Sequence, residues 1–472
     1  MPETSALAAI EDASRSLAGS EQARISNDAQ RLDQARQCAD RAIAALERHV
    51  QSRKEGAQVR RLLARAWKLR GLAEEERRTE MGNKAALDAY DKARRLFVEV
   101  MHHTTPDDVH ELGSIWTHRG MTLLNGAERR DWREACDALE QAITVRRTLP
   151  LGEKWLYPWG LAASIMNRAE ALTKLGLPEN LAEAVAGYDE ALTLLMRIPL
   201  GEHTGAVRQR EVVAWLNRGL ALQAQKTEPS IHEALRSFDM AIFLVRRFGD
   251  THHRACRRIL ACALVNRSSA LLDLGRAQAA QAREAAAVAL RLVADIEQSD
   301  FEAAEAGLKA RHSLCRALIW LQGLNDGADE KGHRDRIAEM TDVIDDALKL
   351  ARHWGEVSGP YFRSTAMEMF RLGCLIFGTM QPHFLADYLL DHLDPERTPD
   401  AEVRNRDLHV AAHEAIMRSA QVMQRRHHSW RHATAGGAPN GEQLETNVQI
   451  LEDLESAAAR LASLREHYLG EK

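Results

Sequence analysis

The sequence predicts an all-α protein built as a solenoid of antiparallel helix pairs, and three observations support this. First, five short segments align without gaps, and their arginines lie 49, 49, 50 and 49 residues apart: Arg70, Arg119, Arg168, Arg218 and Arg267. Second, apolar residues at i, i+4 and i+7, the spacing of one helix face, follow each arginine. Third, strand-like alternation is essentially absent. A fixed period of this length is typical of repeats that bury their cores by stacking.

Each repeat is expected to contain two helices. The second helix carries the apolar set: Ala86/Tyr90/Ala93, Ala135/Leu139/Ala142, Ala184/Tyr188/Ala191, Ala234/Phe238/Ala241 and Ala282/Ala286/Ala289. Gly or Ala after the arginine and Ala on the second helix let two backbones approach closely, while Trp, Tyr or Phe fills the space beside them. Glycines such as Gly176 are expected to end first helices. Asn180 and Ser230 are expected to cap second helices, with Pro178 and Pro229 in the preceding turns.

These residues resemble the tetratricopeptide repeat (TPR) family, whose consensus has a large residue, a glycine, a second-helix alanine, an aromatic residue and another alanine. One repeat fits this order throughout: Trp215, Gly219, Leu222, Ala234, Phe238 and Ala241. The resemblance implies a right-handed superhelical solenoid. Because the period here is about 50 residues rather than the usual ~34, the chain looks like a long-period variant.

The expected organisation has six parts. A degenerate N-terminal repeat or cap (1–55) precedes five TPR-like repeats (56–300) and two atypical helical repeats (301–397). A long helix (398–430), a flexible linker (431–443) rich in Gly and Ala, and a C-terminal amphipathic helix (444–472) follow. The last helix is expected to cap the solenoid, because an open solenoid end needs a cover. Pairing of this helix with a second copy of the chain is the alternative.

Composition narrows the class of protein. The 472 residues carry a net charge of −5 and are 45% apolar, 28% charged and 5% aromatic. This balance creates no overall field that would recruit nucleic acid or an anionic membrane. No apolar run is long enough to span a bilayer, and residues 1–19 lack the features of a secretory signal. The six cysteines form no C-x-x-C pair, so reduced thiols in a cytoplasmic protein are expected.

The repeated arginine has a structural interpretation. An acid follows the second-helix aromatic at equivalent places, so we expect ion pairs within repeats: Arg70–Asp91, Arg168–Asp189 and Arg218–Asp239. Arg267 finds Ala287 at the equivalent place and is expected to be available for another role.

The TPR resemblance implies a concave groove in which first helices bind a protein segment. The implied peptide-binding residues are Arg65, Lys68, Leu72, Met121, Leu124, Met166, Glu170, Leu216, Leu220, Val265 and Leu272. Their middle part is apolar and their start basic, which favours an apolar or amphipathic segment with an acidic flank. Leu72 stands where the carboxylate-clamp pattern of some family members has Asn, so a chaperone C-terminus is not expected. The alternative is a closed groove, filled by the chain itself.

The leading hypothesis is therefore a non-enzymatic adaptor or scaffold. A ligand-sensing solenoid that changes its oligomeric state is one alternative, and a nucleic-acid-binding helical repeat using Arg61–Arg70 and the Arg425 region is another. No P-loop, dinucleotide-binding turn or nucleophile elbow is present. His409 and His413 could share a helix face, yet no third metal ligand accompanies them. We expect no catalytic residue, metal or cofactor, no membrane partner, and no nucleic-acid partner.

Overall fold

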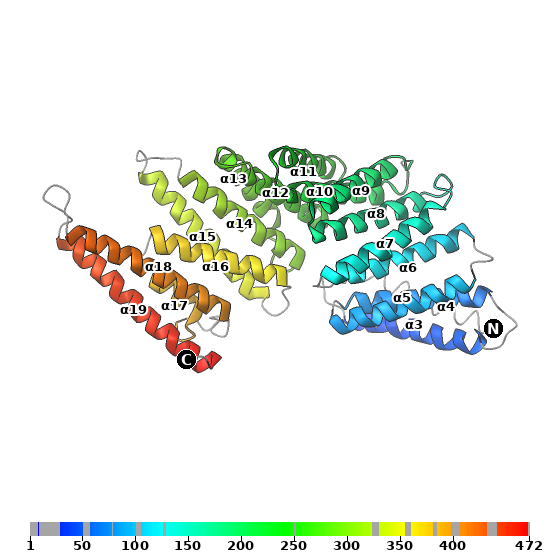
Figure 1. Cartoon of the computed structure of the whole chain (residues 1–472), viewed down its shortest axis with the longest axis horizontal. Helices are drawn as coiled ribbons and strands as arrows, with labels where there is room; N and C mark the ends of the chain where they lie inside the picture. Colours follow the sequence, from blue (N-terminus) through cyan, green and yellow to red (C-terminus); the bar gives the residue numbers. More distant parts are fainter. Residues whose placement is uncertain are drawn as a thin grey trace. The chain divides into compact units, whose positions relative to one another are not determined.

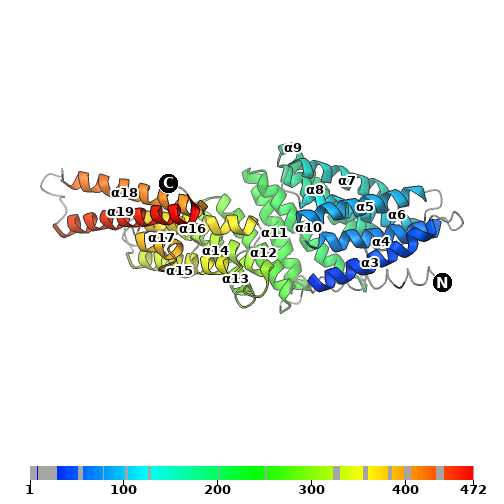
Figure 2. The ribbon, with the colours of Figure 1, turned by 90° about the horizontal axis from the view of Figure 1, so that it is seen from below.

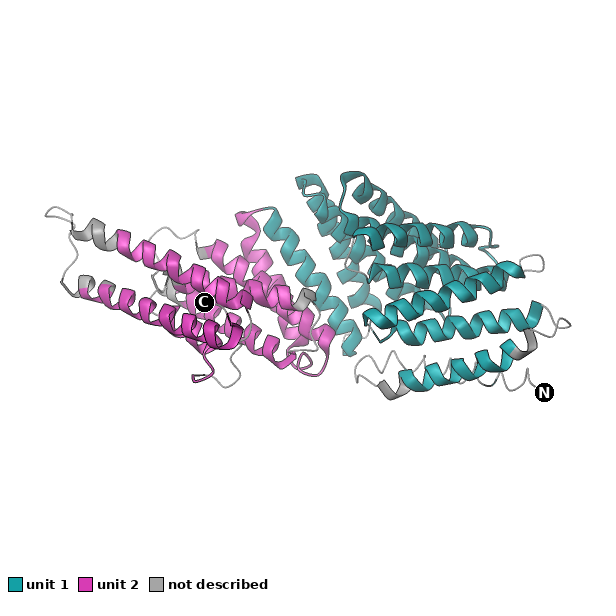
Figure 3. Cartoon of the chain, turned by 60° about the horizontal axis from the view of Figure 1, so that its bottom comes forward, with its two compact units in different colours: residues 1–274 teal, residues 275–472 magenta. Residues whose placement is uncertain are grey.

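The computed structural model describes residues 8, 29–50, 57–77, 79–100, 105–125, 129–199, 201–249, 252–322, 330–354, 360–380, 385–397, 406–431 and 441–470. Within these ranges the chain is helical and contains no strand. The chain divides into two compact units, 1–274 and 275–472, with the boundary between residues 274 and 275 (Figure 3).

The helices of unit 1 are labelled in Figure 1: α3 (Ala29–Val50), α4 (Ala57–Glu75), α5 (Glu80–Glu99), α6 (Pro106–Leu124), α7 (Arg129–Arg147), α8 (Leu156–Leu175), α9 (Pro178–Met196), α10 (Thr204–Ala224), α11 (Glu228–Phe248) and α12 (Arg254–Asp273). Those of unit 2 are η2 (Arg276–Gln278), α13 (Ala279–Val293), α14 (Phe301–Gln322), α15 (Glu330–Trp354), α16 (Pro360–Met380), α17 (Leu385–Leu393), α18 (Arg406–Arg431) and α19 (Gly441–Leu469).

Unit 1 is a stack of helix pairs. α4/α5, α6/α7, α8/α9 and α10/α11 each pack as a pair, and each second helix also packs on the first helix of the next pair. α3 packs on α4 as a second helix would. Successive first helices touch one another as well, from α4 to α6, α8, α10 and α12. The predicted all-α solenoid of TPR-like helix pairs is confirmed.

The close approach within a pair depends on small residues, as predicted. A Cβ added at Gly71 would lie 2.5 Å from Cε1 of Tyr90, and one at Gly120 would lie 2.5 Å from Cγ of Leu139. Both large side chains are fully buried. Glycine is therefore required at these positions, because any larger residue would collide with the partner helix.

Two predicted helix starts were wrong by about one turn. α11 begins at Glu228 and is capped by Thr227, whose side chain accepts a hydrogen bond from the backbone N–H of Ser230. α9 begins at Pro178, so Asn180 lies inside its first turn. Proline fits there because the first N–H groups of a helix have no intrahelical acceptor.

The predicted arginine pairs were also wrong, because each arginine pairs with the preceding repeat. Arg70 reaches Asp40 (2.9 Å), Arg119 reaches Asp91 (3.3 Å), Arg168 reaches Glu140 (2.8 Å), Arg218 reaches Asp189 (2.7 Å) and Arg267 reaches Asp239 (2.7 Å). Arg267 is thus engaged like the others. We call these five pairs the arginine ladder. Each second helix packs against the first helix of its own repeat and against the first helix of the next repeat. The arginine ladder joins each second helix to the first helix of the next repeat.

Unit 2 has one continuous core to which α19 contributes. Leu454, Leu461 and Leu464 of α19 are buried in that core. α19 packs on α17 and α18, and it lies beside α18 in both views (Figures 1 and 2). Arg460 of α19 donates hydrogen bonds to the buried Asp394 carboxylate at 2.6 and 2.8 Å. In the structure, α19 therefore covers α17 and α18, as a capping helix would.

The predicted domain boundaries stay predictions. The division at 274/275 falls inside the predicted stretch of five repeats, and residues 432–440 of the predicted linker lie outside the described residues. All six cysteines are free thiols. Among the described residues, no helix is both long and apolar enough to cross a membrane.

Candidate ligand-binding face of the first helices

The first helices α4, α6, α8, α10 and α12 form one surface of unit 1, which is called the first-helix face. Of the predicted peptide-binding residues, it leaves two apolar side chains exposed, Met121 (37%) and Leu220 (40%). Arg65, Lys68, Leu72 and Glu170 are half-buried. The other five are buried: Leu124, Met166, Leu216, Val265 and Leu272.

The buried members are excluded from the surface because neighbouring first helices touch. Met166 of α8 shares a core cluster with Val207 and Ala214 of α10. On its other side α8 meets α6, where Thr117 and Ser164 hydroxyls lie 2.8 Å apart. The face is thus closed over α8, and substitutions at Met166 or Leu216 would test the core rather than a surface.

Carboxylates pair with two of the basic residues of α4 on this face, Arg61 and Lys68. Lys68 donates a hydrogen bond to Glu111 at 2.5 Å, and Arg61 lies 3.0 Å from Asp108. Burial works to raise the pKa of Glu111, but the Lys68 charge and hydrogen bond outweigh it and the pKa lies below its ordinary value. Arg65 has no carboxylate within ion-pair distance among the described residues.

The same pairing weakens the nucleic-acid alternative. Arg61 and Lys68 are paired as above, and Arg70 belongs to the arginine ladder. The side chains of residues 426–431, the other part of that hypothesis, lie outside the described residues.

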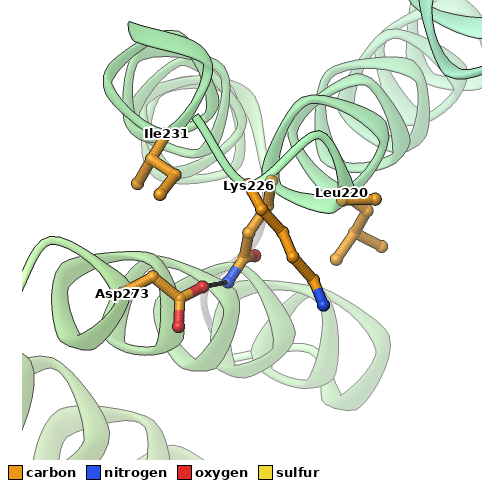
Figure 4. Close-up of a pocket in the computed structure, with 6 residues that line it drawn as sticks. Leu220, Lys226, Ile231 and Asp273 are labelled. Carbon is orange, nitrogen blue, oxygen red and sulfur yellow. Dashed lines mark hydrogen bonds between the residues drawn. The ribbon is translucent and has the colours of Figure 1, made fainter. Parts of the chain in front are cut away.

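A cavity of about 480 Å³ opens beside Leu220, where α10 ends (Figure 4). Leu220, Ala224 and Ile231 supply apolar atoms, and Gln223, Lys226 and Asp273 supply polar ones. Gln223 of α10 donates to Asp273 of α12 at 2.6 Å, which joins two successive first helices under the cavity. Lys226 follows the helix at a positive φ of 56°. Its exposed ammonium group has no acidic partner among the described residues.

Sequence reasoning missed Arg146, although the repeat register contains the signal. The residue eleven positions after the first second-helix alanine is apolar and buried in the neighbouring repeats: Leu46, Phe97, Leu195 and Val245. At that position α7 has Arg146, which is only 4% exposed. A charged residue in a core register costs stability unless it is paired.

Two glycines make room for Arg146. A Cβ at Gly113 of α6 would lie 2.6 Å from Cγ of Arg146, and a Cβ at Gly160 of α8 would collide with its guanidinium group. The arginine thus passes from a second helix between two first helices. Its Nη1 donates to Nδ1 of His110 at 2.9 Å, while its Nε is buried without an acceptor. Burial lowers the Arg146 pKa to about 10, so the group stays charged at neutral pH.

His110 is a neutral partner for this cation. Burial, followed by the charge of Arg146, lowers the pKa of His110 to about 4. The ring is therefore uncharged at neutral pH and can accept the hydrogen bond from Arg146, but it contributes no compensating charge.

A second arginine without a carboxylate at ion-pair distance among the described residues lies nearby. The Arg210 guanidinium carbon of α10 is 3.7 Å from the ring centroid of Trp159, the residue before Gly160 on α8. Burial lowers the Arg210 pKa to about 10, and its charge is close enough to lower that of Arg146 too. The indole N–H of Trp159 is buried without an acceptor. Arg146, Arg210 and Trp159 are called the arginine–tryptophan cluster below.

Among the described residues, no three His, Cys, Asp or Glu side chains come together as a metal site. His409 is 1% exposed and His413 is exposed, so the two do not present a shared surface.

Comparison with known proteins assigns the chain to no family. Neither a protein-family model nor a curated protein matches the chain. Among solved structures, it is similar to a Rap protein complexed with competence and sporulation factor (14% identity, TM-score 0.42, covering 97% of this chain and 100% of that one). It is also similar to a circular tandem repeat protein (15%, 0.22, 99% and 100%) and to Naa15/Naa10 bound to HypK-THB (14%, 0.17, 98% and 83%). At these identities and TM-scores, the functional argument rests on this chain's own residues.

Proposed function

We propose that the chain is a non-enzymatic scaffold whose first-helix face in unit 1 binds a segment of another protein. The observation that carries this proposal is the cavity beside Leu220. There the exposed Leu220 side chain lies at the edge of an open space that Lys226 also lines. Lys226 has no acidic partner among the described residues. Peptide grooves on helical repeats combine apolar anchors with a few charged groups that set orientation.

Charge on this face supports an acidic flank in the bound segment. Arg65 and Lys226 lack carboxylate partners among the described residues, whereas Lys68 and Arg61 are already paired. An acidic flank would therefore meet cations other than Arg61 and Lys68, and Arg65 and Lys226 are two such cations on this face. Burying a Leu-sized side chain contributes roughly 1.5–3 kcal/mol, so Met121 and Leu220 can anchor the apolar part.

The test is an affinity capture from native lysate with identification by mass spectrometry, using wild type and the Met121→Glu/Leu220→Glu variant. A matched control, Val98→Glu/Met240→Glu, places the same charges at exposed apolar positions of the second helices α5 and α11 (52% and 39% exposed). The proposal expects a partner kept by wild type and by the control, and lost by the first-helix variant. A partner lost by the control and kept by the first-helix variant would assign binding to the second helices and refute it.

A further inference from the structure

The arginine–tryptophan cluster is donor-rich and acceptor-poor. Arg146 Nε and Trp159 Nε1 are both buried without an acceptor, and neither Arg146 nor Arg210 has a carboxylate within ion-pair distance among the described residues. A buried unpaired donor and a buried unpaired charge each destabilise a fold. We therefore expect a binding partner to supply the acceptors and negative charge that would offset this loss of folding stability.

Nearby carboxylates are already neutralised. Glu111 is paired with Lys68, and Asp107 lies 2.7 Å from the Lys154 ammonium group. His110 is neutral at neutral pH, as shown above. Glu111 is close enough for its charge to favour the charged form of Arg146, but it already pairs with Lys68. Among the described residues, Arg146 and Arg210 therefore have no carboxylate of their own at ion-pair distance.

The construction of the site argues against an accident of sequence. The repeat register calls for an apolar residue at position 146, and Gly113 and Gly160 are both needed to admit the arginine. The arginine and the two glycines together place one guanidinium group between α6 and α8, where neighbouring repeats have an apolar side chain. Arg210 and Trp159 then add a second guanidinium group and an indole N–H from α10 and α8.

We propose that this cluster binds carboxylates of the acidic part of the segment held by the first-helix face, an inference that rests on the proposed function. The two guanidinium groups match two carboxylates of neighbouring acidic residues, because arginine forms paired, charge-assisted hydrogen bonds with carboxylate oxygens. The low-dielectric surroundings strengthen each such bond. Trp159 offers a further donor.

The test is calorimetric titration of the full-length protein with hexaglutamate, with hexaglutamine and inorganic phosphate as comparison ligands. Wild type is expected to bind hexaglutamate, and Arg146→Met is expected to weaken that binding about 10- to 100-fold, the range for charge-assisted hydrogen bonds. Arg210→Met, which changes a half-buried residue, should weaken it similarly. Arg130→Met is the matched control, since Arg130 lies on the same helix α7 and its side chain is 81% exposed.

Several outcomes would overturn the assignment. These are equal binding of hexaglutamine, equal weakening by the control, no weakening by either cluster variant, no binding of hexaglutamate, or binding of phosphate alone. Circular dichroism of each variant checks that the fold is kept. If the partner found by affinity capture binds Arg146→Met and Arg210→Met as tightly as wild type, only this inference fails. If that partner binds the Met121→Glu/Leu220→Glu variant as tightly as wild type, the proposed function fails instead.

Discussion

The guanidinium group of Arg218 donates a hydrogen bond to the Asp189 carboxylate at 2.7 Å, and so joins α10 to the second helix of the preceding repeat. An ion pair at the same place links each of the five repeated arginines to the preceding repeat. Arg218 also donates to the Ser237 hydroxyl of its own repeat at 2.8 Å. The ladder therefore acts at the interfaces between repeats, where a solenoid gains much of its stability.

The ladder can be tested by two double-mutant cycles. Arg218→Met and Asp189→Asn are expected to show a coupling free energy of about 0.2–1 kcal/mol, because the pair is partly exposed to solvent. Arg218→Met with Asp239→Asn is the control cycle and should show none, since Asp239 pairs with Arg267. Urea unfolding measures both. Coupling found only in the second cycle would mean that Arg218 pairs with Asp239 of its own repeat instead of Asp189.

A pair of glycine substitutions separates close packing from intrinsic helix preference. A Cβ added at Gly187 of α9 would lie at ordinary contact distance, 3.4 Å from Cβ of Ala169. Gly187→Ala should therefore stabilise the protein by about 0.5–1 kcal/mol, the helix-propensity gain. At Gly219 an added Cβ would collide with the ring of Phe238, so Gly219→Ala should destabilise by about 1–3 kcal/mol. Thermal unfolding checks both signs, and a loss at both positions would contradict the α8/α9 spacing.

Replacement of Arg146 should raise stability. Arg146→Met puts an apolar side chain of similar length at a position where neighbouring repeats have Leu46, Phe97, Leu195 and Val245. Removal of the uncompensated buried charge should stabilise the fold by about 1 kcal/mol or more. The readout is the midpoint of urea unfolding, with Arg130→Met expected to leave it nearly unchanged. A clear loss of stability would mean that Arg146 holds the core together.

Acid should destabilise the protein through His110. Its folded pKa of about 4 lies below the ordinary 6.5, so between these values the unfolded chain binds a proton that the folded chain does not. Stability is then present above pH 6.5 and falls as pH drops toward 4, by roughly 3 kcal/mol at most. The charged groups facing His110 are Arg146 from α7, Lys68 from α4, and Asp107 and Glu111 from its own helix.

The matched variant is His110→Gln, which keeps an acceptor for Arg146 and does not titrate. Between pH 6.5 and 4, the unfolding free energy of the variant should depend less on pH than that of wild type. Unfolding followed at several pH values isolates this contribution, because the carboxylates that titrate at lower pH are common to both proteins. Parallel pH profiles would show that His110 is not the group responsible.

The helix pairs were predictable because their causes are local. Apolar spacing sets one face of each helix, and a glycine such as Gly71 opposite Tyr90 signals a close approach between two helices that are adjacent in sequence. The exposed part of the candidate face, Met121 and Leu220, also followed from register. The burial of Met166 did not, since it depends on how closely α8 and α10 lie, which no single repeat records.

The sequence by itself determined the period, the two helices per repeat and the positions of the small residues, because these follow from short-range geometry that recurs in register. Only the tertiary structure decided which acid each arginine meets. Arg218 has an aspartate at an equivalent position on α9 and on α11, and a periodic sequence presents both equally. The stacking of each second helix against the following first helix selects Asp189. The same stacking encloses Arg146 between two glycines of different repeats, with no carboxylate at ion-pair distance among the described residues.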